Sequence, residues 1–224
     1  MLKIKNHRLV DTEFVKTPNM GGVITPKFIV LHYTCGYTMR SSVEFFSKKS
    51  ARAAAHIVTG RAGEIVQQVP FNRKGWHAGP SRSHGIRGLN NHSIGIEQAN
   101  IGWLEKHGDE WRDYYGSRVL KDGSVLSSKT GKLKFSYDTR PETWLQAPHP
   151  RAGGGVRYWE PYSDEILQAT EDVCVALLAK YPSIKYIVSH EEIDTRGWKT
   201  DPGPAFPMAR FQNLLYKPES DDES

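Results

Sequence analysis

The stretch FIVLHY, residues 28–33, decides the interpretation of the fold. It is a continuous apolar run that ends near a histidine, which is typical of a buried central strand. A second strand is predicted over residues 184–188, directly before Ser189 and His190, and a third over the alternating residues 93–97. We therefore expect a sheet whose strand ends carry His32 and His190.

Helices and a hairpin are predicted between these strands. Ser41 or Ser42 can cap a helix over residues 41–49, and Ser163 can cap the clearest helix, over residues 164–180. Two short apolar runs within residues 55–69 flank a glycine-containing turn and predict a hairpin. A short helix is expected over residues 208–216. The fold class is α/β or α+β, with a single mixed β-sheet flanked by helices.

Three segments differ from this pattern. Residues 1–26 are polar and are expected to form an N-terminal arm over a domain that covers residues 27–216. Residues 102–162 are polar, aromatic and glycine-rich, and they predict a long loop-rich insertion with at most one hairpin. Residues 217–224 form an acidic tail.

Composition excludes several classes of protein. The 224 residues are 38% hydrophobic and 25% charged, which is enough for a packed core. The net charge of +5 suits an anionic partner, but no basic run favours nucleic acid, so none is expected. No apolar stretch approaches the roughly 18 residues of a membrane span, so stable membrane insertion is not expected. The N-terminus lacks a signal-peptide pattern, which predicts a cytoplasmic protein. The two cysteines, Cys35 and Cys174, are expected to be free thiols.

Histidines at strand ends suggest a metal site. Asp201 follows His190 by eleven residues, in a loop stiffened by prolines. Two imidazoles, one carboxylate and a water would form a catalytic zinc site with one open position. The spacing alone leaves open the alternative that His32 is a packed core histidine and that His190 ends a strand by chance.

Several motifs occur in a specific order along the chain. They are AHIV (55–58), GEIVQQVP (63–70), WHAG (76–79), NHSIGIE (91–97) and KTDPGPAF (199–206), beside the strand that ends near His32. Together they resemble the type-2 N-acetylmuramoyl-L-alanine amidase family, which contains AmpD-type recycling amidases, phage lysis amidases and peptidoglycan recognition proteins. The resemblance covers roughly residues 27–101 and 163–216.

The resemblance implies a zinc-dependent amidase that cuts the bond between the lactyl group of N-acetylmuramic acid and L-alanine, in peptidoglycan or soluble muropeptides. Residue by residue, it implies that zinc is held by His32, His190 and Asp201. It implies acid–base chemistry by Glu97 and stabilisation of the intermediate by Lys199. Substrate contacts are expected from His77, Asn91 and Trp76.

One departure from the family pattern concerns the residue before the hairpin histidine. Phage members have tyrosine there and this chain has Ala55, which shifts the expected proton transfer onto Glu97. His56 is expected to pack or to orient a zinc ligand. His84, His92, His107 and His149 are expected to be solvated.

Alternative functions follow from the same sequence. A non-hydrolytic recognition module would typically lack one zinc ligand, whereas all three are present. A cysteine hydrolase built on Cys35 has no support from the resemblance. Aromatic and arginine side chains in residues 102–162 suit either a substrate-binding lid or simple packing of the loops. If the chain is a phage lysis enzyme, it would be released to the cell wall.

Overall fold

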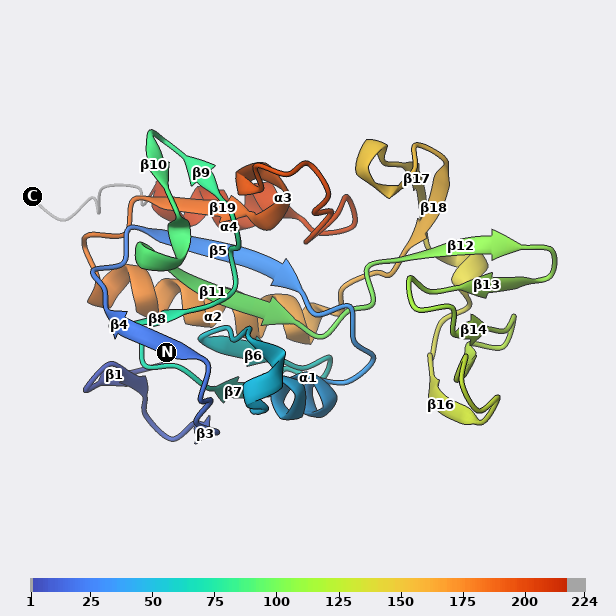
Figure 1. The fold of residues 1–224 in the computed structure, drawn as a ribbon, viewed down its shortest axis with the longest axis horizontal. Helices are drawn as coiled ribbons and strands as arrows, with labels where there is room; N and C mark the ends of the chain where they lie inside the picture. Colours follow the sequence, from blue (N-terminus) through green and yellow to red (C-terminus); the bar gives the residue numbers. More distant parts are fainter. Residues whose placement is uncertain (1, 217–224) are drawn as a thin grey trace, which may run out of the picture.

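The computed structural model describes residues 2–216, so the tail predicted over 217–224 lies outside the described residues. Its centre is a mixed six-stranded sheet (Figure 1). The strand order is β19 (Tyr186–Ser189), β5 (Phe28–Tyr33), β11 (Ser93–Gln98), β6 (Ile57–Thr59), β7 (Ile65–Gln67) and β3 (Glu13–Phe14). β19, β5, β11 and β6 are parallel neighbours, and β6 and β7 form the predicted antiparallel hairpin. The predicted fold class is confirmed.

The two longer helices begin at side chains that accept hydrogen bonds from free backbone amides. α2 (Asp164–Lys180) begins as predicted, with the Ser163 hydroxyl accepting a hydrogen bond from the Ile166 amide at 3.2 Å. α1 (Met39–Phe46) begins earlier than predicted, because Thr38 is its cap and accepts from the Ser41 amide at 3.2 Å. α3 (His190–Ile193) and α4 (Met208–Gln212) are short. No helix within residues 2–216 combines the length and apolar character needed to cross a membrane.

The two faces of the main sheet have different surroundings. Alternate residues of β5 and β11 pack against α1 and α2 in the main core, among them Ile29, Leu31, Ile94 and Ile96. The other face carries Phe28 and Val30 in a smaller apolar cluster. By the same alternation His32, Ser93, Gly95 and Glu97 lie on this second face, away from the helices.

Residues 102–162 fold into a second sheet, which projects to one side of the first (Figure 1). The order is β16 (Leu133–Ser136), β15 (Ser124–Leu126), β14 (Arg118–Val119), β13 (Glu110–Arg112), β12 (Trp103–His107), β18 (Val156–Trp159) and β17 (Leu145–Pro148). The prediction of loops with at most one hairpin was wrong here. The cause is the shortness of the strands. Four of them share one apolar ladder, formed by buried Trp111, Val119 and Val125 and partly buried Phe135 as successive cross-strand partners.

An ion pair between buried Glu160 and partly buried Arg61 connects the second sheet to the domain. The Glu160 carboxylate, directly after β18, accepts from the Ile101 amide at 2.6 Å and from the Arg61 guanidinium at 2.6 Å. Arg61 lies in the turn of the β6–β7 hairpin, so these contacts hold the two ends of the insertion, near Ile101 and at Glu160, against the main sheet. Removal of Arg61 would leave the buried Glu160 carboxyl without its ion-pair partner.

The remaining strands are short. They are β1 (Ile4–Lys5), β2 (Arg8–Leu9), β4 (Met20–Val23), β8 (Arg73–Gly75), β9 (Arg82–Ser83) and β10 (Ile86–Arg87). Residues 2–26 contribute strand β3 to the edge of the main sheet and pair β4 with β8.

Candidate metal centre

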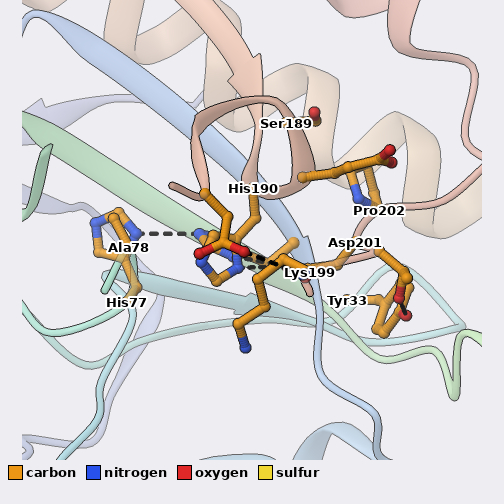
Figure 2. Close-up of polar contacts among 12 residues, drawn as sticks. Tyr33, His77, Ala78, Ser189, His190, Lys199, Asp201 and Pro202 are labelled. Carbon is orange, nitrogen blue, oxygen red and sulfur yellow. Dashed lines mark hydrogen bonds and ion pairs between the residues drawn. The ribbon is translucent and has the colours of Figure 1, made fainter. Parts of the chain in front are cut away.

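Three donor atoms from separate segments meet at the end of the main sheet (Figure 2). His32 lies at the end of β5, and His190 follows β19, whose Ser189 is the register partner of Leu31. The two Nδ1 atoms are 3.0 Å apart. Asp201 Oδ2 lies 3.0 Å from His32 Nδ1 and 2.8 Å from His190 Nδ1. The structure thus brings together all three residues named as zinc ligands.

The donor set is buried and suits a cation. Burial and the neighbouring His190 lower the pKa of His32 to about 4, so its imidazole is neutral at neutral pH. Burial opposes ionisation of Asp201, but the charge and hydrogen bonds of the two histidines outweigh it and lower the pKa of that carboxyl. Two imidazoles and one carboxylate whose donor atoms face one another form a ligand set that zinc prefers. The residues therefore fit a zinc ion.

Glu97 lies beside this cluster because of strand register. It is the Cα partner of His32 across β11 and β5. Its Oε2 is buried, with no hydrogen-bond partner among residues 2–216. Burial, then the charge of Asp201, raises the pKa of the Glu97 carboxyl well above its usual value. A carboxyl with a raised pKa and a free oxygen can both take and give a proton.

Lys199 stands two residues before Asp201 in a loop that a buried aspartate organises. Asp194 Oδ2 accepts from the backbone amides of Trp198 at 3.0 Å and Lys199 at 3.2 Å. Its other oxygen accepts from Arg196 Nε at 3.1 Å. Sequence reasoning missed Asp194, although a carboxylate followed by a glycine-containing turn is a known signal for such loops.

Two hollows flank the donor cluster. One, of about 210 Å³, is lined by Glu97, His190, Lys199 and Asp201 together with Trp76, His77 and Tyr115. The other, of about 420 Å³, also reaches Lys199 and Asp201, and its wall is aromatic: Trp103, Tyr114, Tyr115 and Trp198. Three of these aromatic residues belong to the insertion, so the second sheet builds one wall of the cavity.

The three expected substrate contacts lie in different surroundings. Trp76 lines the smaller hollow and is 41% exposed. His77 is buried, and both of its ring nitrogens are hydrogen-bonded within the protein. Asn91 is exposed and accepts from Lys74 Nζ at 3.1 Å. The neighbouring Asn90 fixes the backbone of the WHAG motif, because its side-chain oxygen accepts from the amides of His77 at 3.0 Å and Ala78 at 2.8 Å.

Other chemistry-bearing residues also have defined places. His149 was expected to be solvated, but it is buried and its Nε2 lies 3.1 Å from Glu191 Oε1. The prediction was wrong because the insertion packs onto the loop after β19, where Arg151 donates to the Glu191 and Lys199 carbonyls at 2.6 and 3.2 Å. Cys35 and Cys174 are free, as predicted. Burial, then the charge of Asp201, raises the pKa of the Cys35 thiol, which opposes a thiolate nucleophile.

Comparison with known proteins identifies the family. The model of the N-acetylmuramoyl-L-alanine amidase family matches residues 23–204. The chain belongs to this family. The resemblance noted from the motifs is thereby confirmed, and the matched range includes all three residues of the donor cluster.

Several relatives of this amidase-family chain are known. The 1,6-anhydro-N-acetylmuramyl-L-alanine amidase AmpD of Escherichia coli is 30% identical over 167 residues, which cover 74% of this chain and 60% of AmpD. The N-acetylmuramoyl-L-alanine amidase AmiD of Escherichia coli is 26% identical over 190 residues, covering 83% of this chain and 51% of AmiD. The chain thus spans about three fifths of the length of AmpD. In fold, it resembles the crystal structure of an AmpD derivative with a TM-score of 0.58 and 23% identity, over 96% of this chain and 99% of that one.

Proposed function

We propose that the chain is a zinc-dependent amidase that hydrolyses the bond between the lactyl group of N-acetylmuramic acid and L-alanine. The observation that carries the proposal is the convergence of His32, His190 and Asp201 beside a buried carboxyl with a free oxygen, Glu97. Family membership supports the amide as the bond that is cut. A solved structure of AmiD is a complex with an anhydro-N-acetylmuramic acid peptide, which supports the substrate class.

His32, His190 and Asp201 would hold the zinc ion. When bound, zinc would lower the pKa of a water molecule and polarise the substrate carbonyl. Glu97 takes the proton of the attacking water and delivers it to the departing alanine nitrogen, a role that its raised pKa suits. Lys199, at the edge of both hollows, stabilises the negative charge that develops on the carbonyl oxygen.

The two hollows would hold the substrate on either side of the scissile amide. Aromatic faces such as Tyr114, Tyr115 and Trp198 offer apolar surface for stacking on sugar rings. We propose that the insertion thereby contributes to substrate binding. Soluble muropeptides would suit a recycling enzyme, whereas intact wall would suit a lysis enzyme.

Mass spectrometry of two defined substrates tests the proposal. The zinc-loaded protein is incubated with a soluble anhydro-muropeptide and with intact sacculi, each with and without a chelator. We expect release of peptides that begin with L-alanine, and loss of this release with chelator. The preferred substrate separates recycling from lysis. Absence of cleavage of both substrates by protein with confirmed bound zinc would refute the proposed activity and support a recognition module.

A further inference from the structure

We infer that His77 is a positioning residue that, together with Ser93, fixes the proton of His32 on Nε2 and so leaves Nδ1 bare toward the donor cluster. The inference deepens the proposed function and rests on it only for the identity of the metal. The family resemblance suggested a substrate contact for His77. The hydrogen bonds around its ring point to a different task.

A chain of hydrogen bonds leads from the Leu89 carbonyl, which can only accept, through Ser93 to His77. The Leu89 carbonyl accepts from the Ser93 hydroxyl at 2.7 Å, which uses the single proton of that hydroxyl. The second contact of Ser93 Oγ is with His77 Nε2 at 3.2 Å. Because the Ser93 proton is already committed, His77 Nε2 must donate. The proton of His77 therefore lies on Nε2.

The position of the proton on His77 determines the position of the proton on His32. The His77 ring is buried, and its ring nitrogens contact His32 and Ser93 but no carboxylate that could balance an imidazolium charge, so the ring carries one proton only. Its Nδ1 is then a bare acceptor, 3.0 Å from His32 Nε2. His32 Nε2 must donate to it. A neutral His32 with its proton on Nε2 has a free lone pair on Nδ1, the atom that faces His190 and Asp201.

Without His77, His32 would favour the other tautomer, with its proton on Nδ1. Asp201 Oδ2 lies 3.0 Å from His32 Nδ1, and a proton on Nδ1 would make a charge-assisted hydrogen bond to that carboxylate. Such a proton would also occupy the lone pair that a metal needs. The acceptor on His77 competes with Asp201 for the His32 proton, so the pair His77 and Ser93 favours the tautomer that can bind a cation.

Residues on and beside the main sheet fix the position of the His77 ring. Ser93 and Gly95 lie on the same face of β11, two residues apart. A Cβ at Gly95 would stand 2.5 Å from both Cγ and Nδ1 of His77, so only glycine leaves room for the ring. From the other side, Asn90 accepts from two consecutive backbone amides, those of His77 and Ala78. The ring position is thus determined by three separate features.

The first test reads the protons directly. Long-range ¹H–¹⁵N correlation spectra of the full chain with ¹⁵N-labelled histidine report which imidazole nitrogen is protonated, with and without zinc. At neutral pH we expect His77 to be neutral with a protonated Nε2 in both states, and His32 to have a protonated Nε2. A proton on Nδ1 of His77, or a cationic His77, would overturn the inference whatever the activity of the protein.

The second test measures zinc affinity by competition with a chromophoric chelator. His77→Leu removes the acceptor and should weaken zinc binding by about 10- to 100-fold, the usual effect of losing a partner of a ligating histidine. His77→Asn keeps an oxygen near the position of Nδ1 and should restore most of the affinity. His84→Leu, at an exposed histidine stacked on Tyr186, is the matched control. Wild-type affinity in a folded His77→Leu variant would contradict the inference.

The two proposals can fail separately. A protein that binds zinc with the expected tautomers but cuts neither substrate would refute the amidase and leave the role of His77 intact. An active amidase whose His77 carries its proton on Nδ1 would do the reverse.

Discussion

Glu97 and His32 are register partners on the parallel strands β11 and β5, with their side chains on the face of the sheet that α1 and α2 leave free. Two strands 65 residues apart in the chain are held by backbone hydrogen bonds, so the carboxyl and the imidazole have a fixed spacing that no loop sets. Rigid elements position reacting groups more precisely than loops do. The geometry makes Glu97 the group whose removal should affect the reaction most directly.

Glu97→Gln should abolish most of the amidase activity and leave zinc binding unchanged. The amide keeps the size of the side chain but cannot transfer a proton, so kcat/KM should fall by about 100- to 10,000-fold. Peptide release and zinc content are measured on the same sample. Glu192→Gln, at an exposed glutamate of α3, is the control and should behave like the wild type. Activity of Glu97→Gln near the wild-type value would assign the proton transfer to another group.

Zinc should stabilise the fold through Asp201. A ligand that binds only the folded state at about 100 times its dissociation constant stabilises it by about 2.7 kcal/mol. The free energy of unfolding in denaturant should therefore rise with zinc and fall with chelator in the wild type. Asp201→Ala should not respond to zinc, while Asp172→Ala, on the exposed side of α2, should respond fully. An equal response of both variants would place the metal elsewhere.

The sequence predicted the main sheet because the signals of its strands are local, whereas the full donor cluster was implied by the motif resemblance. An apolar run such as residues 28–33 can only be a buried strand or part of a buried helix, and its length favours the strand. His32 and His190 stand out because each lies at the end of such a run. Their approach to 3.0 Å depends on strand order, which a single sequence does not contain and which the motif resemblance supplied.

The positioning residues could not be predicted in the same way. Asn90 and Asp194 act on backbone amides, and Ser93 acts on a histidine 16 residues away. Polar side chains of this kind are common on protein surfaces, so their type and spacing do not indicate which group they will hydrogen-bond. The insertion was misread for a related reason: each strand contributes one apolar residue to the ladder, too few to produce a period of two.

The aromatic wall of the larger hollow should act on substrate binding. Tyr114 and Trp198 are 69% and 60% exposed beside the donor cluster. An aromatic contact contributes about 0.5–1.5 kcal/mol, so Tyr114→Ala or Trp198→Ala should raise KM by roughly 2- to 10-fold with little change in kcat. Leu133→Ala removes an exposed apolar residue elsewhere in the insertion and serves as the control. Unchanged KM values in both aromatic variants would show that these side chains do not contribute to substrate binding.

His56 should make the metal-free fold sensitive to acid. Its Nδ1 accepts from the Gly95 amide at 3.0 Å, and its Nε2 donates to the Arg73 carbonyl at 2.8 Å. Burial lowers the pKa of its imidazole to about 4, below the unfolded value of about 6.5. Between these values the unfolded chain binds a proton that the folded chain does not. The stabilising contribution is complete above pH 6.5 and is lost as the pH falls toward 4.

The slope of stability against pH isolates this effect. With chelator present, the free energy of unfolding of the wild type should fall between pH 6.5 and 4. One proton contributes about 1.4 kcal/mol per pH unit to that slope, and His56→Gln should remove this contribution whatever its own stability at neutral pH. The difference in slope is the readout because the pKa of His32 is also lowered to about 4, and its contribution remains in both proteins. Parallel curves for wild type and His56→Gln would show that His56 gains its proton equally in the folded and unfolded states.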